Sequence, residues 1–105
     1  MHEVESNGAE IPALGLGTWD IRGAQCVEIV AEGLRLGYRH IVTAQGYDNE
    51  REVGEGLRAS GVARDDVFLT TKVWHDKLNA GALERSAEES IARLGVDHVD
   101  LLLVH

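Results

Sequence analysis

Residues 39–50 read RHIVTAQGYDNE, and they contain a strand, a loop and the start of a helix. The run from Arg39 to Ala44 contains three consecutive β-branched residues, Ile41, Val42 and Thr43, which is typical of a strand. A polar loop follows, and between Asn49 and Ser60 the apolar residues Val53 and Leu57 recur at helical spacing. A strand that leads through a short loop into a helix is one βα unit.

Units of this kind recur along the 105 residues at intervals of about 30 residues, the length of a βα unit. Before them, an Asn-Gly pair inside residues 4–11 indicates a β-hairpin. Helical crossovers place consecutive strands side by side and parallel. The sequence therefore predicts an α/β fold in a single domain, residues 1–105, with an N-terminal β-hairpin followed by (βα)3β. We predict strands over 14–19, 39–44, 67–74 and 99–104, and helices over 26–36, 49–60 and 82–94.

Charge and cysteine content narrow the classes of function. Ten Lys and Arg residues stand against 18 Asp and Glu residues, which gives a net charge of −8. This charge argues against nucleic acid and anionic membranes as partners, because both require a basic surface. No run approaches the ~20 apolar residues of a membrane helix, and the first residues lack the apolar run of a signal peptide. The single cysteine, Cys26, fits a reducing compartment, so we expect a cytoplasmic protein in which Cys26 is buried and unreactive.

Four stretches, taken in order, resemble the aldo-keto reductase family. The family pattern is Arg-x-Ile-Asp-Thr-Ala, two residues, then Tyr-x-Asn-Glu, and residues 39–50 match it except that Val42 replaces the Asp. Residues 11–19 (IPALGLGTW), 70–74 (TTKVW) and 100–105 (DLLLVH) are similar to its first, third and fourth barrel strands. The resemblance implies the first half of a TIM (β/α)8 barrel, a fold of ~250 residues. It also implies NADPH-dependent reduction of small aldehydes and ketones.

The chemistry of carbonyl reduction explains the residue types at the matched positions. Hydride addition to the carbonyl carbon leaves negative charge on the oxygen, to which an acid must give a proton. The resemblance makes Tyr47 this acid, Lys72 the cation that stabilises its phenolate, and His105 the residue that orients the carbonyl. Singly, these residues would pass for a loop aromatic, a strand-end lysine and a terminal histidine. In the family's order, and at the carboxyl ends of predicted strands, they favour the catalytic interpretation.

The resemblance also assigns a cofactor loop and a substrate pocket. Gly17, Thr18 and Trp19 lie beside the nicotinamide end of NADPH in this interpretation. The same Trp19 and Trp74 form aromatic walls of the pocket, together with Tyr47 and His105. The family's contacts to the adenosine phosphates lie in the later half of the barrel, so we expect NADPH binding by this chain to be weak or absent.

Two further patterns do not predict a site. Gly15-x-Gly17 lacks the third glycine of a dinucleotide-binding fingerprint, because Asp20 stands in its place. Neither His75-Asp76 nor His98-x-Asp100 has a third ligand at a convincing spacing, so no metal site is predicted.

Val42 leads to a specific expectation about activity. Valine is compatible with a strand, but it accepts no hydrogen bond and does not balance the charge of Lys72. We therefore expect the chain to be inactive or severely impaired as a reductase. The alternative is a non-enzymatic folding fragment or an oligomeric assembly module built on a half-barrel.

The fourth predicted strand leads to an expectation about assembly. Residues 99–104 are apolar on both faces, and a free edge of such a strand is a template for pairing. We expect a homodimer or higher oligomer through this edge. We also expect the barrel-facing sides of Leu16, Ile41 and Leu69 to lack a cover in a monomer.

Overall fold

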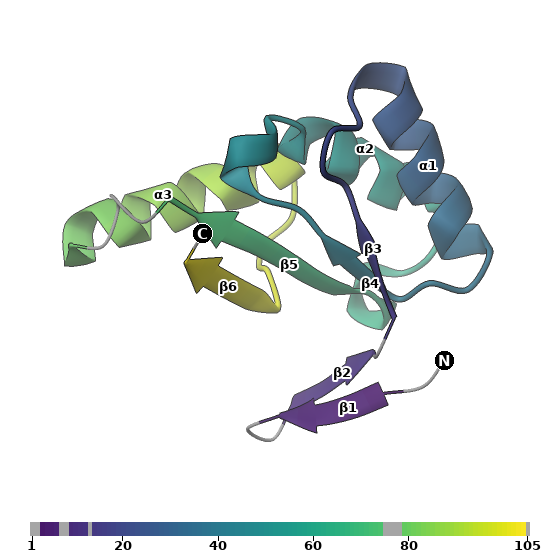
Figure 1. Cartoon of the computed structure of the whole chain (residues 1–105), viewed down its shortest axis with the longest axis horizontal. Coiled ribbons are helices and arrows are strands. Elements are labelled where there is room, and N and C mark those ends of the chain that lie inside the picture. The colour runs from purple at the N-terminus through teal and green to yellow at the C-terminus, as the bar shows by residue number, and fades with distance from the viewer. Residues whose placement is uncertain (1–2, 7–8, 13, 75–78, 105) are drawn as a thin grey trace.

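The computed structural model describes residues 3–6, 9–12, 14–74 and 79–104 (Figure 1). An N-terminal hairpin is followed by strands that alternate with helices, as predicted. The strands are β1 (Glu3–Ser6), β2 (Ala9–Pro12), β3 (Gly15–Gly17), β4 (His40–Val42), β5 (Phe68–Val73) and β6 (Leu101–Val104). The helices are α1 (Gly23–Arg35), α2 (Glu50–Ser60) and α3 (Ala80–Leu94), with the 3-10 turns η1 (Gln45–Tyr47) and η2 (Arg64–Asp66).

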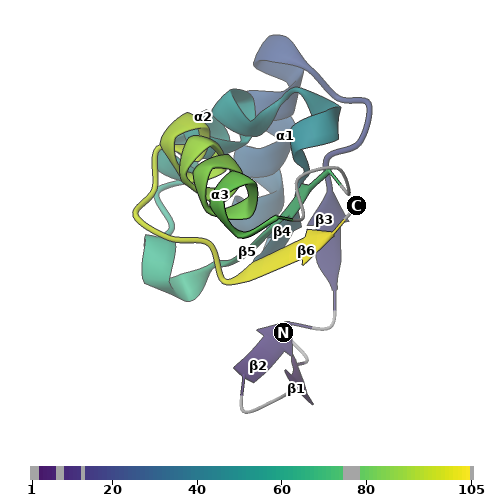
Figure 2. The same ribbon diagram turned by 90° about the vertical axis from the view of Figure 1, so that its left-hand side faces the viewer.

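The strands form two sheets. β1 and β2 pair antiparallel, while β3, β4, β5 and β6 form a parallel sheet in that order. Figure 2 shows α1, α2 and α3 on one face of the parallel sheet and the hairpin beyond one of its ends. This arrangement confirms the predicted hairpin and (βα)3β order. No helix of the described ranges is long and apolar enough to cross a membrane.

The covered face of the parallel sheet contains the hydrophobic core. The register pairs Leu16 with Ile41 and Ile41 with Leu69, so these three side chains share one face. Ile41 and Leu69 are fully buried and cluster with Val30 and Leu34 of α1. At about 0.8 kcal/mol per buried CH₂, this contact between sheet and helices is the main source of stability.

The position of Leu16, Ile41 and Leu69 corrects one expectation. We expected them to face the barrel interior, but they face the helices. A Cβ on Gly33 of α1 would lie 2.6 Å from Leu16 Cδ2, which places the Leu16 side chain against that helix. The alternation of side chains along a strand was predictable, but the sequence does not state which of the two sets meets the helices.

The opposite face of the sheet contains the remaining side chains of the same strands, and we call it the open face. It comprises Gly15, Gly17, His40, Val42, Phe68, Thr70, Lys72, Leu101 and Leu103, as the register dictates. Within the described residues no helix packs on this face (Figure 2). The open face is the side that would line the interior of a closed barrel.

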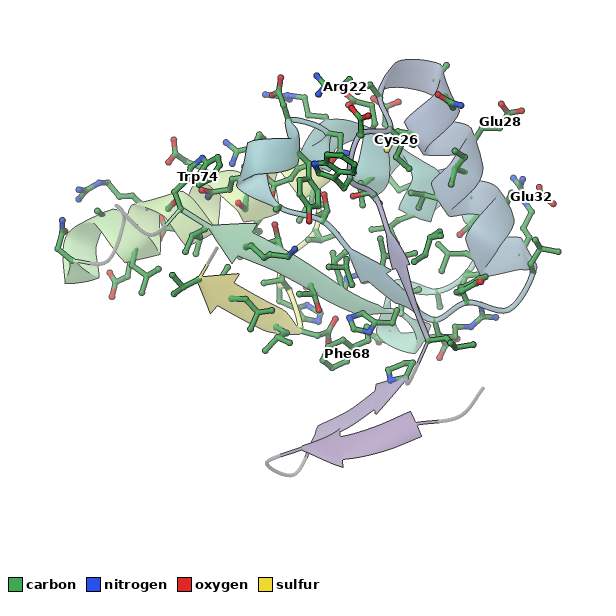
Figure 3. The ribbon with its side chains drawn as sticks, in the orientation of Figure 1. Arg22, Cys26, Glu28, Glu32, Phe68 and Trp74 are labelled. Atoms are coloured by element: carbon green, nitrogen blue, oxygen red, sulfur yellow. The ribbon has the colours of Figure 1, made fainter. Side chains whose placement is uncertain are left out.

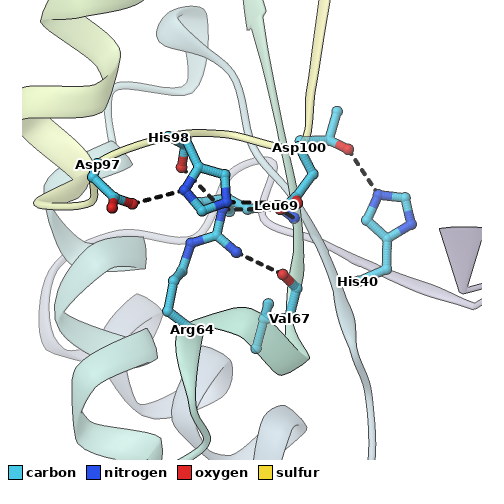
Figure 4. Close-up of polar contacts among 8 residues, drawn as sticks. His40, Arg64, Val67, Leu69, Asp97, His98 and Asp100 are labelled. Carbon is cyan, nitrogen blue, oxygen red and sulfur yellow. Dashed lines mark hydrogen bonds and ion pairs between the residues drawn. The ribbon is translucent and has the colours of Figure 1, made fainter. Parts of the chain in front are cut away.

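Two side chains hold β6 beside β5 (Figure 4). Asp100 accepts hydrogen bonds from Arg64 at 2.9 Å and from the backbone N–H of Leu69 at 2.8 Å. Arg64 also donates to the carbonyl oxygens of Val67 and His98. The pair is partly exposed, with side chains 21% and 26% exposed. The loop before β6 is therefore fixed to the start of β5.

Candidate active site

Tyr47 and Lys72 meet at the carboxyl ends of the strands. Lys72 is on the open face near the end of β5, and Tyr47 ends the 3-10 turn that follows β4. The Lys72 Nζ donates a hydrogen bond to the Tyr47 Oη at 2.7 Å and lies 4.9 Å from the ring centroid. Two residues 25 positions apart in sequence are thus in direct contact. An ammonium in this position stabilises a phenolate, which is the arrangement that proton donation to a carbonyl oxygen requires.

Val42 lies on the same face and at the same end of the sheet. It pairs with Thr70, so its side chain is on the open face with that of Lys72. A Cβ on Gly15 of β3 would lie 3.3 Å from Val42 Cγ2, so the valine side chain extends over β3. The backbone carbonyl of Val42 accepts hydrogen bonds from the N–H and the hydroxyl of Thr18, both at 3.1 Å. The strand end is therefore well formed, although the residue offers no side-chain acceptor.

The predicted cofactor loop begins where β3 ends. Thr18 is fully buried, whereas the next residue, Trp19, is 72% exposed. Asp20 has a φ of 61°, in the left-handed region that few residues other than glycine adopt. A Cβ on Gly17 would have no atom within 4 Å, so there is open space beside the loop.

Trp74 follows β5 and lies against the turn that contains Tyr47. A Cβ on Gly46 would lie 2.5 Å from Cζ2 of Trp74, so the indole ring covers Gly46. Figure 3 shows Trp74 at the opposite end of β5 from Phe68. Trp74 also borders a cleft of about 480 Å³ between η1, the start of α2 and α3. The third predicted catalytic residue, His105, lies outside the described residues, as do His75 and Asp76.

Sequence reasoning missed two buried side chains two and three residues after Tyr47, Asn49 and Glu50. Asn49 and Glu50 served only as letters of the family pattern, yet they are 1% and 2% exposed. Glu50 accepts hydrogen bonds from the Thr71 hydroxyl at 2.6 Å and from Arg93 Nε at 2.8 Å, which ties α2 to β5 and α3. The signal that pointed to them was their fixed position after the tyrosine.

Gln45 is a third residue that sequence reasoning missed. Its amide Nε2 donates to the hydroxyl of Ser86 at 2.6 Å and lies 3.0 Å from the hydroxyl of Ser90. Both serines belong to α3. Gln45 therefore anchors the turn that contains Tyr47 to this helix, and no pattern in the sequence indicated the contact.

Burial controls the electrostatics of two residues near the core. Burial, and then the charge of Glu52, raise the pKa of Cys26 to about 11. The thiol is buried as predicted, and it is a poor nucleophile. Burial lowers the pKa of His40, although the Pro12 carbonyl and the nearby Asp100 act in the opposite direction. Among the residues that the structure describes, no group of three His, Cys, Asp or Glu side chains is placed to hold a metal ion.

Comparison with known proteins identifies similar chains. Over 95 residues the chain is 45% identical to methylglyoxal reductase DkgB of Yersinia pestis, covering 90% of this chain and 36% of that protein. It is 43% identical over 100 residues to glycerol 2-dehydrogenase (NADP(+)) of Saccharomyces cerevisiae, covering 95% of this chain and 31% of that protein. Among solved structures, a putative 2,5-diketo-D-gluconic acid reductase B has a TM-score of 0.94 and 55% identity, with coverage of 100% and 37%.

These matches agree with the architecture described above. The chain spans roughly a third of the length of these relatives, 31–36%, which corresponds to the first part of the barrel. The profile of the Aldo/keto reductase family matches residues 13–105, which is nearly the whole chain. The chain therefore belongs to the aldo/keto reductase family.

Proposed function

We propose that this chain contains the acid–base part of an NADPH-dependent carbonyl-reductase site, and that Val42 leaves this site inactive or severely impaired. The observation that carries the proposal is the 2.7 Å hydrogen bond between Lys72 Nζ and Tyr47 Oη. The pair lies at the carboxyl ends of parallel strands, where barrel enzymes place their chemistry. Relatives whose names state a reductase or an NADP(+)-dependent dehydrogenase support the substrate and cofactor classes.

The residues of the site would divide the work of the reaction. NADPH, when bound, supplies the hydride. Tyr47 would donate its hydroxyl proton to the carbonyl oxygen as charge develops there, while Lys72 stabilises the resulting phenolate. Trp19 and Trp74 would hold the carbonyl compound between them. Thr18, fixed by its two hydrogen bonds to Val42, would keep the cofactor loop at the strand ends.

Val42 is the reason for expecting impaired chemistry. In the family pattern this position is a carboxylate, which accepts a hydrogen bond from the lysine and balances its charge. The valine side chain does neither, so the orientation and charge of Lys72 lose a support at the point where the tyrosine depends on it. The strand end is well formed with valine, so we expect the change to affect catalysis more than folding.

An enzymatic assay of the 105-residue chain tests this proposal. We expect no measurable NADPH-dependent reduction of simple aldehydes. We also expect NADPH to bind no tighter than about millimolar, near −4 kcal/mol, because only the loop at residues 17–19 contributes contacts. Turnover close to the ~10 per second of a median enzyme would contradict the proposal. Micromolar binding, measured by quenching of tryptophan fluorescence, would contradict its cofactor part.

A second candidate is a non-enzymatic assembly module, and the edge of β6 supports it. Leu103 and Val104 are 42% and 57% exposed, and in the described residues only β5 pairs with β6. An exposed apolar strand edge is a template for a second copy of the chain, so we propose a homodimer or higher oligomer through β6. The net charge of −8 on each copy opposes this association, which should therefore tighten as salt is added.

Sedimentation at micromolar concentration tests the assembly proposal, with and without added salt. A monomer under both conditions would contradict it.

We also propose a reducing, cytoplasmic location, because the chain has a single cysteine and therefore forms no internal disulfide.

A further inference from the structure

We propose that Asn49 is a positioning residue that holds the loop of residues 17–21 in a fixed place relative to Tyr47. The inference rests on the proposed function in one respect, because it treats this loop as the nicotinamide side of the site. The contacts by which Asn49 joins the loop after β3 to the turn after β4 do not depend on that assumption.

The loop has little support of its own. The hydrogen bond across its turn, from the N–H of Ile21 to the carbonyl oxygen of Thr18, is long at 3.4 Å. Asp20 lies in the left-handed region without the conformational freedom of glycine. Arg22, at the N-cap of α1, provides no side-chain hydrogen bond to that helix, and its 3.8 Å ion pair with Asp20 joins two exposed side chains and adds little. The conformation of the loop therefore depends on contacts from elsewhere in the molecule.

Asn49 supplies those contacts from the start of α2. Its Nδ2 donates to the carbonyl oxygen of Thr18 at 2.7 Å and to that of Ile21 at 2.9 Å. These two carbonyls lie at the two ends of the loop's turn, so a single amide group closes it. Both amide hydrogens are used, and the side chain is only 1% exposed.

The third hydrogen bond of Asn49 fixes the segment that contains Tyr47. The hydroxyl of Thr43 donates to Asn49 Oδ1 at 2.8 Å. This bond closes the segment of residues 43–49 that contains Tyr47, across its two ends. The backbone of Asn49 is itself fixed, because its carbonyl oxygen accepts the N–H of Val53 at 3.0 Å. One side chain therefore holds both the loop of residues 17–21 and the segment of residues 43–49 that contains Tyr47.

The use of this side chain is unusual for its position. Asparagine at a helix N-cap ordinarily accepts a hydrogen bond from the first turn of its own helix. Asn49 is the N-cap residue of α2 and makes no such bond. Its amide is directed instead to the loop after β3. Aspartate has nearly the same shape, but it lacks both donors and would place a charge against two carbonyl oxygens.

Hydrogen exchange of backbone amides in the 105-residue chain tests the inference. We expect Asn49→Asp and Asn49→Ala to speed exchange at the amides of Thr18 and Ile21 by at least about tenfold relative to the core amide of Ile41, which is fully buried in a strand paired on both sides. The matched control is Ser60→Ala, which removes two hydrogen bonds at the other end of α2. This control should leave the ratio of loop to core exchange unchanged.

A milder variant covers the case in which the Asn49 variants do not fold. Thr43→Val removes only the bond to Asn49 Oδ1 and should raise loop exchange selectively, by a smaller factor. An unchanged exchange ratio in the folded Asn49 variants, or in Thr43→Val if those do not fold, would overturn the inference. Equal acceleration of loop and core amides would overturn it as well, because Asn49 would then stabilise the whole fold and not the loop in particular.

A titration with NADPH separates this inference from the proposed function. We expect Asn49→Asp to weaken NADPH binding several-fold, while Ser60→Ala leaves it unchanged. If the unmodified chain binds NADPH with micromolar affinity, the cofactor part of the proposed function fails. The exchange ratio at Thr18 and Ile21 still decides the role of Asn49.

Discussion

The two faces of the parallel sheet differ in what they contribute, although the same strands form both. On the covered face, Ile41 and Leu69 have no exposed surface and pack against α1. One position further along β4, Val42 is on the open face near Lys72, which contacts Tyr47. Adjacent residues of one strand therefore belong to different parts of the protein. Substitutions on the covered face should change stability, and those on the open face should change chemistry.

The largest expected effect on stability contrasts two adjacent residues of β4. Ile41→Ala should lower the free energy of unfolding by about 2–5 kcal/mol, because it leaves a cavity in the core. Val42→Ala should lower it by about 1 kcal/mol, since that side chain is only half-buried. Urea unfolding of both variants measures the difference. Equal losses would mean that the open face is packed as tightly as the covered one.

A smaller contrast uses two glycines. A Cβ on Gly54 of α2 would clash with the carbonyl oxygen of Leu94, a backbone atom that cannot move alone, whereas a Cβ on Gly17 meets nothing within 4 Å. Gly54→Ala should therefore cost about 1–3 kcal/mol through overpacking between α2 and α3. Gly17→Ala should be nearly neutral for stability. Thermal unfolding of the two variants checks this, and a strongly destabilised Gly17 variant would show that the loop is packed.

The smallest expected effect concerns pH and His40 at the base of the open face. Its ring contacts Thr70 Oγ1 at 2.8 Å and Phe68 edge-on, and burial lowers its pKa below 6.5. The unfolded chain then binds a proton that the folded chain resists, so stability should fall as pH drops through 6.5. The fall should level off below the lowered pKa of the folded state. In His40→Phe this part of the pH dependence should be absent, and identical profiles would refute the assignment.

The order of strands and helices was predictable from sequence, but the residues at which the strands end were not. Apolar periodicity located each strand of the parallel sheet and each of the three α-helices that connect them. It overestimated the lengths of β3 and β4. They were predicted over 14–19 and 39–44 and are observed over Gly15–Gly17 and His40–Val42. Hydrogen bonds from Thr18 to Val42 and from Thr43 to Thr70 continue past these strand ends into the loops of the site. Propensity does not distinguish such loop residues from a strand.

The candidate site was predictable only where a family pattern supplied it. The pattern named Tyr47 and Lys72, and the structure places them in contact. It gave no function to Asn49 or Glu50, because all their side-chain partners except Thr43 are 21–43 residues away in sequence. The expectation for Leu16, Ile41 and Leu69 was wrong for a related reason. Which face of a strand meets the helices is settled by register and packing, which composition does not contain.

The most direct measurement of the central claim compares Val42 with aspartate in a complete barrel. Residues 13–105, the part matched by the family profile, would replace the equivalent segment of a full-length reductase of the family. NADPH-dependent reduction of an aldehyde would then be followed for this chimera and for its Val42→Asp variant. We predict that Val42→Asp raises kcat by about 10²-fold or more, because it restores the support that Lys72 gives to Tyr47. Equal rates in two well-folded barrels would contradict the account.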